Sequence, residues 1–95
     1  MTFVKLVIRQ EAVDDLDRIY ARIRAHNMSA AIRVVRALRK RMDDITVPEL
    51  VNSGRPGRSH GTREIVQPPY VIVYEVDVER WTVTVLAVTH AALRT

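Results

Sequence analysis

Hydrophobic residues recur with two different periods in the first half of the chain. Over residues 3–9 they alternate with polar residues, which is the period of a half-buried strand. From Glu11 the spacing becomes helical, and it resumes in a second helix after a break at 26–29, where Asn27 or Ser29 can serve as the cap. The short break predicts an antiparallel helical hairpin. Its expected core positions are Val13, Leu16, Ile19, Tyr20, Ile23, Ala31, Val35, Leu38, Met42 and Ile45.

The second half of the chain alternates between turns and strands. Pro48 ends the second helix, and all three glycines lie in the segment 54–61 that follows. Runs rich in β-branched residues then predict strands at 62–67, 70–76 and 81–88. The order strand, helix, helix and three strands indicates an α+β fold, in which the two-helix hairpin packs on one face of an antiparallel sheet.

Composition favours one small domain over residues 1–95. The chain has 95 residues, 47% of them hydrophobic, and no cysteine, so aliphatic packing must stabilise it without disulfides. Three histidines at unrelated positions predict no metal site, and no motif indicates a cofactor. No apolar run has the length of a membrane span and the first residues do not resemble a secretion signal, so we expect a cytoplasmic protein with no membrane partner.

The net charge of +4 is unevenly distributed. Residues 22–41 contain seven cations and no acid, which leaves the rest of the chain at −3. One interpretation is a solvated helical hairpin whose charges pair with one another, as Asp14 can with Arg18 four residues later. The other interpretation is a basic surface that binds an acidic partner.

Five segments add a more specific signal. They are VIRQEAVDDL at 7–16, GRPGR at 54–58, GTREIV at 61–66, PYVIVYEV at 69–76 and VLAVTH at 85–90. Together with the order of predicted elements, they resemble the RelE/ParE superfamily of toxins from type II toxin–antitoxin systems. The resemblance covers essentially the whole chain. It implies the fold of that superfamily and a toxin, of the kind associated with plasmid stabilisation, that a cognate antitoxin neutralises.

Two activities occur in this superfamily: RelE-type members cut messenger RNA on the ribosome, and ParE-type members poison DNA gyrase. Metal-independent RNA cleavage needs cations and proton-transferring groups around the phosphate. Val71 stands where the RelE-like pattern has an arginine, and no tyrosine follows Tyr74, although that pattern has one near the C-terminus. We therefore expect a ParE-like gyrase inhibitor that is not an enzyme. The alternative is a ribosome-dependent mRNA endonuclease.

The two activities suggest overlapping sets of residues. An endonuclease would have to use Arg58, Arg63 and His90. In a purely structural interpretation, Arg63 pairs with Glu64 across strands and His90 hydrogen-bonds a loop carbonyl. The residues expected to contact the target are Arg55, Arg58, Arg63, His90 and Arg94.

The resemblance also implies how the antitoxin binds. Antitoxins of this superfamily usually carry an acidic segment, disordered when alone, that covers the toxin with a helix and often with an added strand. We therefore expect a cognate antitoxin with an acidic C-terminal segment. Nothing resembles a DNA-reading motif, so no direct sequence-specific DNA binding is expected. The expected antitoxin contacts are Tyr20, Arg24, Met28, Val34, Arg36 and Trp81, although core packing explains Trp81 equally well.

Overall fold

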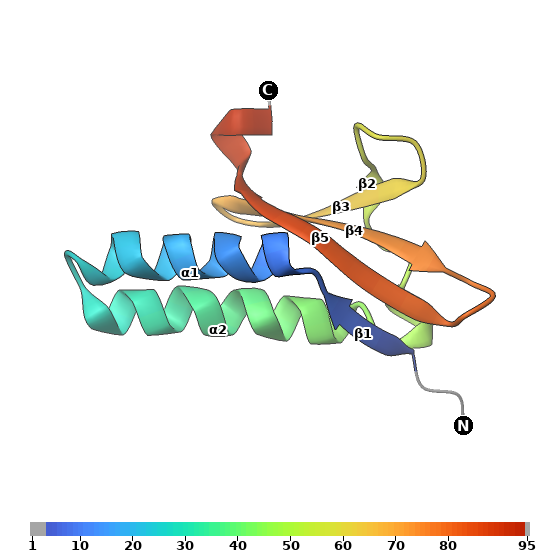
Figure 1. Ribbon diagram of the computed structural model, residues 1–95, viewed down its shortest axis with the longest axis horizontal. Coiled ribbons are helices and arrows are strands. Elements are labelled where there is room, and N and C mark those ends of the chain that lie inside the picture. Colours follow the sequence, from blue (N-terminus) through green and yellow to red (C-terminus); the bar gives the residue numbers. More distant parts are fainter. Residues whose placement is uncertain (1–3, 95) are drawn as a thin grey trace.

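The computed structural model describes residues 4–94, in which two helices pack against one face of a five-stranded sheet (Figure 1). The elements are β1 (Lys5–Ile8), α1 (Gln10–Arg24), α2 (Met28–Asp44), η1 (Pro48–Leu50), β2 (Arg55–Pro56), β3 (Thr62–Gln67), β4 (Tyr70–Asp77), β5 (Thr82–His90) and η2 (Ala91–Arg94). The order of the main elements confirms the expected α+β fold. The short elements β2, η1 and η2 are additional to those that the sequence predicts.

The sheet has the strand order β1-β5-β4-β3-β2. Strands β2 to β5 are antiparallel to one another, whereas β1 pairs with β5 in parallel. The sheet is therefore mixed, and the expectation of antiparallel pairing was wrong for β1. The parallel pairing follows from the position of β1 at the edge of the sheet. There it lies beside β5, the last strand, and leads directly into α1, which packs along β5.

The core lies between the helices and the sheet, and its largest fully buried side chain is Tyr74 on β4. The Tyr74 hydroxyl donates a hydrogen bond to the carbonyl of Val51 (3.1 Å) and accepts one from the backbone N–H of Gly54 (2.9 Å). A Cβ at residue 54 would lie only 2.6 Å from that hydroxyl oxygen, so the close approach requires glycine. Tyr74 thus fixes the segment before β2 to the core.

The helices α1 and α2 form the expected antiparallel hairpin. As predicted, Asn27 caps α2, because its Oδ1 accepts a hydrogen bond from the N–H of Ala30 (3.0 Å). Val34 packs against the core, whereas Val35 is half-buried on the opposite flank of the helix. The prediction of Val35 in the core and Val34 outside it was therefore wrong. Both flank the buried stripe of α2, and periodicity alone does not say which flank faces the sheet.

Candidate functional site

A hollow of about 530 Å³ lies between α1 and the terminal half of β5. Two arginines of α1 stand on one side, and Leu93 of η2, which is 74% exposed, lies on the other. The hollow is lined by Asp15, Arg18, Ile19, Arg22, Tyr70, Val88, Thr89, His90 and Leu93. It thus combines cations with aliphatic surface, a combination that suits a ligand carrying both a carboxylate and apolar groups.

Three side chains connect the two sides of this hollow. Nη2 of Arg22 donates a hydrogen bond to the hydroxyl of Tyr70 (2.9 Å), and the Tyr70 ring meets the His90 ring edge to face at 5.6 Å. Nδ1 of His90 accepts a hydrogen bond from the N–H of Ala92 (3.1 Å). This contact differs from the expected bond to a loop carbonyl, because here Nδ1 is the acceptor.

The free edge of β5 forms the floor of the hollow. Strand β1 covers β5 only as far as Val85, whose carbonyl accepts a hydrogen bond from Arg9 (3.0 Å). Beyond that point Oδ2 of Asp15 accepts the N–H of Val88 (2.9 Å), while Oδ1 pairs with Arg18. The predicted pairing of Arg18 with Asp14 was wrong by one residue, and Oδ1 of Asp14 instead accepts a hydrogen bond from Nε2 of Gln10 (2.9 Å).

Three other expected target residues, Arg55, Arg58 and Arg63, lie near the opposite edge of the sheet. Arg63 donates hydrogen bonds from Nη1 to the carbonyls of Gly54 (2.9 Å) and Asn52 (3.4 Å). Its neighbour Glu64 is only 5% exposed, and Oε1 of Glu64 lies 3.6 Å from Nη2 of Arg55. The predicted Arg63–Glu64 ion pair was therefore wrong: consecutive strand residues point to opposite faces, and Glu64 pairs with the residue opposite it on β2.

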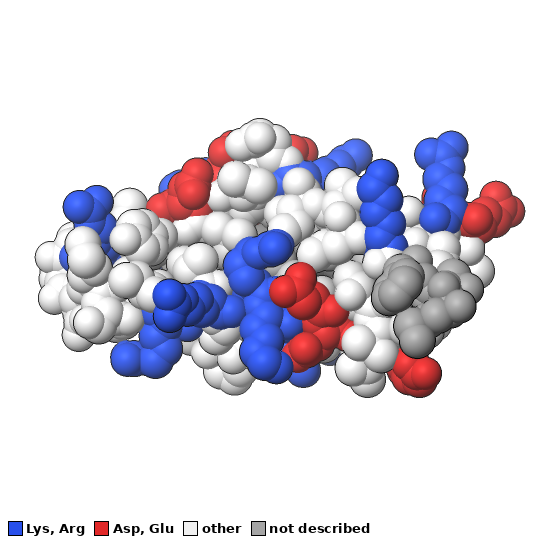
Figure 2. Space-filling model, turned by 90° about the horizontal axis from the view of Figure 1, so that it is seen from below, with Lys and Arg blue, Asp and Glu red and all other residues white. Residues whose placement is uncertain are grey.

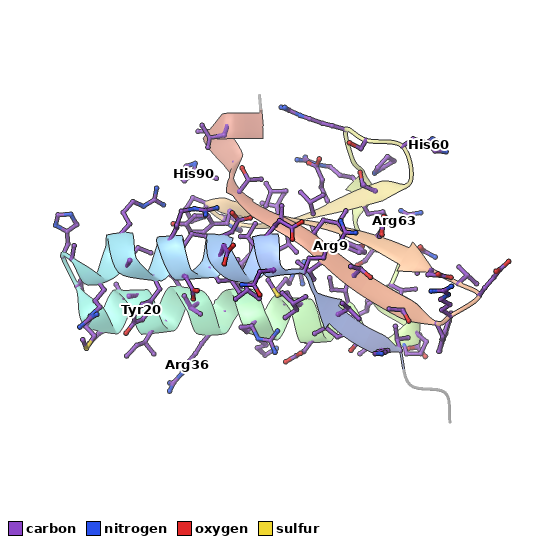
Figure 3. All side chains as sticks on the ribbon, viewed as in Figure 1. Arg9, Tyr20, Arg36, His60, Arg63 and His90 are labelled. Atoms are coloured by element: carbon purple, nitrogen blue, oxygen red, sulfur yellow. The ribbon has the colours of Figure 1, made fainter. Side chains whose placement is uncertain are left out.

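The endonuclease candidates do not converge on one phosphate. Arg63 lies opposite Tyr74, which lies opposite Val85, and His90 is five residues further along β5. At the rise of a strand this separation is about 16 Å, and Figure 3 shows Arg63 and His90 well apart along the sheet. Val71 is only 1% exposed and offers no charge. Arg58 lies in the exposed β2–β3 loop and the backbone of Arg94 lies in η2, but the Arg94 side chain is outside the described part of the chain.

An exposed apolar stripe runs along α2. Met28 is 50% exposed, Ile32 is 37% exposed, and Val35 is half-buried. Their spacings of four and three residues place them on one face, which we call the outer stripe. Met28 is among the predicted antitoxin contacts but Ile32 is not, although the spacing of four residues between them is present in the sequence.

The remaining antitoxin candidates divide between the hairpin and the far end of the molecule. Arg24 and Arg36 are exposed on the hairpin and Tyr20 is half-buried there, and Figure 3 shows Tyr20 and Arg36 on the helix layer. Trp81 precedes β5 at the end of the molecule opposite the hairpin turn (Figure 1). It packs against the core, and its indole N–H is buried with no hydrogen-bond partner among residues 4–94. The structure thus supports the core interpretation of Trp81.

A metal centre is not found in the part of the chain that the structure describes, where no three His, Cys, Asp or Glu side chains come close enough to hold an ion. Within the same residues, neither helix combines the length and the apolar character that crossing a bilayer requires.

Comparisons with known proteins agree with this architecture. The family model of the ParE toxin of the type II toxin–antitoxin system parDE matches residues 6–93. The toxin-like protein Y4kP of Sinorhizobium fredii is 39% identical over 82 residues, which cover 84% of this chain and 80% of that protein.

Solved structures share the fold at lower sequence identity. A chain of the chromosomal ParDE system from P. aeruginosa superposes with a TM-score of 0.81 at 19% identity, covering 92% of this chain and 95% of that one. A mutant of the E. coli toxin RelE in the free state gives 0.69 at 16% identity, covering 97% and 87%. The RelBE2 toxin–antitoxin complex from Mycobacterium tuberculosis gives 0.61 at 24% identity, covering 94% and 99%.

The family model spans nearly all of the described residues, and the mixed sheet with its helical hairpin is the fold of both ParE and RelE toxins. The chain therefore belongs to the ParE toxin family of type II toxin–antitoxin systems.

Proposed function

We propose that this toxin arrests growth by inhibiting DNA gyrase and that it does not cut messenger RNA. The observation that carries the proposal is the dispersal of the groups that cleavage would need. Arg63 is held by two loop carbonyls about 16 Å along the sheet from His90. The buried Val71 stands where the RelE-like pattern has an arginine. Stabilising a phosphorane requires several donors at one point, and these residues do not meet at one.

The β2–β3 segment is the proposed contact with gyrase. Arg55 is 60% exposed at its side chain, and Arg58 lies in the loop that follows. Glu64 holds both, because its Oε1 lies 3.6 Å from Arg55 and its Oε2 accepts the backbone N–H of Arg58 (3.3 Å). The two arginines are thereby presented from an ordered edge of the sheet, which lowers the entropy lost on binding. Arg63 supports this segment from the other face and becomes a structural residue.

The cognate antitoxin is proposed to cover the hairpin and the adjoining hollow. The outer stripe offers apolar anchors, Arg36 lies one turn from Ile32 on the same helix, and Arg24 is exposed on α1 of the same hairpin. An amphipathic helix with acidic flanks complements such a surface. Next to α1, Arg18 and Arg22 offer further cations at the hollow. Because gyrase and such an antitoxin are cytoplasmic partners, the proposal places this toxin in the cytoplasm.

The proposal can be tested in cells that express the toxin without an antitoxin. We expect a reporter plasmid to lose negative supercoiling while the 5′ ends of messenger RNAs stay unchanged. Arg58→Gln should weaken the effect on the plasmid, whereas Arg80→Gln, which removes an exposed cation from the β4–β5 turn, should not. New, codon-specific messenger RNA ends with unchanged plasmid topology would contradict the proposal and favour the ribosome-dependent endonuclease.

A further inference from the structure

Helix α2 carries a row of exposed cations, of which only Arg36 belongs to the proposed antitoxin contacts. Arg33, Arg36 and Lys40 are all exposed, and their spacings of three and four residues put them on one side of the helix. We call these three residues the basic ridge. Figure 2 shows Lys and Arg side chains gathered on the face of the helix layer turned away from the sheet, and Figure 3 shows Arg36 pointing outward from that layer.

The charges on this ridge are poorly compensated within the molecule. Among residues 4–94, neither Arg33 nor Arg36 has a carboxylate within ion-pairing distance. Lys40 has one partner, Asp44, at 3.6 Å, and the Lys40 side chain is 79% exposed. Like charges three or four residues apart on a helix repel one another. A bound polyanion would remove that repulsion.

The ridge lacks what a protein partner usually requires. Protein interfaces depend on buried apolar or aromatic anchors, and on α2 those anchors belong to the outer stripe on the neighbouring flank. Binding to a phosphodiester backbone needs only spaced cations, and the planar guanidinium of arginine matches a phosphate with two parallel hydrogen bonds. The chemistry of the ridge therefore fits nucleic acid better than an acidic peptide.

We propose that the basic ridge binds the phosphate backbone of duplex DNA without reading its sequence. No acidic residue interrupts α2 between Arg33 and Lys40, and this seven-residue step spans about 10 Å of helix. That length of duplex carries about six phosphate charges. The choice of DNA over RNA rests on the proposed function, since gyrase acts on DNA. The inference that the ridge binds phosphates does not depend on the proposed function. Such binding would concentrate the toxin where its proposed target works.

The test is the affinity of purified full-length toxin for a fluorescent DNA duplex, measured by anisotropy at several salt concentrations without gyrase. The ridge variant is Arg33→Gln with Arg36→Gln, which keeps good helix formers in α2. The matched control is Lys5→Gln with Arg80→Gln, which removes two exposed cations from β1 and from the β4–β5 turn. Both variants lower the net charge from +4 to +2.

We expect the ridge variant to bind DNA at least about tenfold more weakly at low salt and to lower the slope of log K against log salt by about two. The control should stay close to wild type. Equal losses in the two variants would show that net charge alone drives binding and would overturn the ridge. Tighter binding to an RNA duplex of the same sequence would overturn the assignment to DNA. Because gyrase is absent, neither result decides whether the toxin inhibits that enzyme.

Discussion

Two consecutive residues of β3 hold the preceding segment from opposite faces of the sheet. Arg63 bonds the carbonyls of Asn52 and Gly54, and Glu64 engages Arg55 and the backbone of Arg58. Strand alternation makes this division possible. The sequence places all of these residues in or near a glycine-containing turn. It cannot separate the structural arginine from the exposed ones, because the hydrogen-bond partners are backbone carbonyls that leave no trace in the sequence.

The roles of the two arginines can therefore be separated by substitution. Arg63→Ala removes donors from two carbonyls and should lower the free energy of unfolding by about 1–2 kcal/mol. Arg58→Gln should leave stability within about 0.5 kcal/mol of wild type, because an exposed substitution usually does, yet it should reduce gyrase inhibition. Urea unfolding and supercoiling inhibition, measured on both variants, check the division. An Arg63 variant of unchanged stability with abolished inhibition would assign Arg63 to the target contact instead.

Gly54 packs against Tyr74 too closely to accept a side chain without a shift of its neighbours. Gly54→Ala should cost about 1–3 kcal/mol, because the added Cβ overlaps the Tyr74 hydroxyl oxygen and the Glu64 carbonyl. The matched control is Gly61→Asn: residue 61 has a φ of 83° and open space around its Cβ position, and asparagine tolerates this conformation. Urea midpoints give the comparison. Similar midpoints for the two variants would contradict the close packing around residue 54.

For helices and strands, the period of hydrophobic residues predicted the position of an element where that element is long. The strand at 62–67 and the two helices lie where the sequence predicts them. The direction of β1 was not predictable, because a strand has the same alternation whether its neighbour is parallel or antiparallel. The two-residue strand β2 is too short to show any period. The hollow beside α1 was also missed as a site, since it joins residues more than sixty positions apart, such as Arg22 and His90.

The outer stripe of α2 makes a prediction at this scale. Ile32→Glu places a charge in the middle of the stripe and keeps a good helix former, so it should weaken antitoxin binding at least about tenfold while the toxin stays folded. Val78→Glu is the control, because Val78 is 67% exposed in the β4–β5 turn, at the other end of the molecule. Calorimetric titration with the antitoxin segment checks both variants. If the Ile32→Glu and Val78→Glu variants bound the antitoxin segment with equal affinity, the outer stripe would not be part of the interface.

Over the whole molecule, the cations of residues 22–41 are distributed among different surfaces of the helical hairpin. The modest net charge of +4 conceals seven cations in residues 22–41, and the fold distributes them over both helices of the hairpin. Arg22 lines the hollow beside α1, whereas Arg33, Arg36 and Lys40 form the basic ridge on α2. The sequence predicts the excess of charge but not this division, because it depends on how each helix is rotated against the sheet.

This charge predicts how salt affects assembly with an acidic antitoxin segment. Long-range attraction accelerates the encounter, and salt screens it beyond about 10 Å at 0.1 M. Raising the salt concentration should therefore slow association strongly and change dissociation little. Stopped-flow or surface-based kinetics separate the two rates. If salt acted mainly on dissociation, or if the binding segment were strongly basic, electrostatic steering by the hairpin would be wrong.

The central claim is that this member of the ParE toxin family acts on gyrase. The most direct measurement is ATP-dependent supercoiling of relaxed plasmid by purified gyrase, titrated with the full-length toxin, alone and premixed with its antitoxin. Supercoiling should fall as toxin is added and should be restored by the antitoxin. Full supercoiling at saturating toxin, together with cleavage of ribosome-bound messenger RNA by the same preparation, would contradict it.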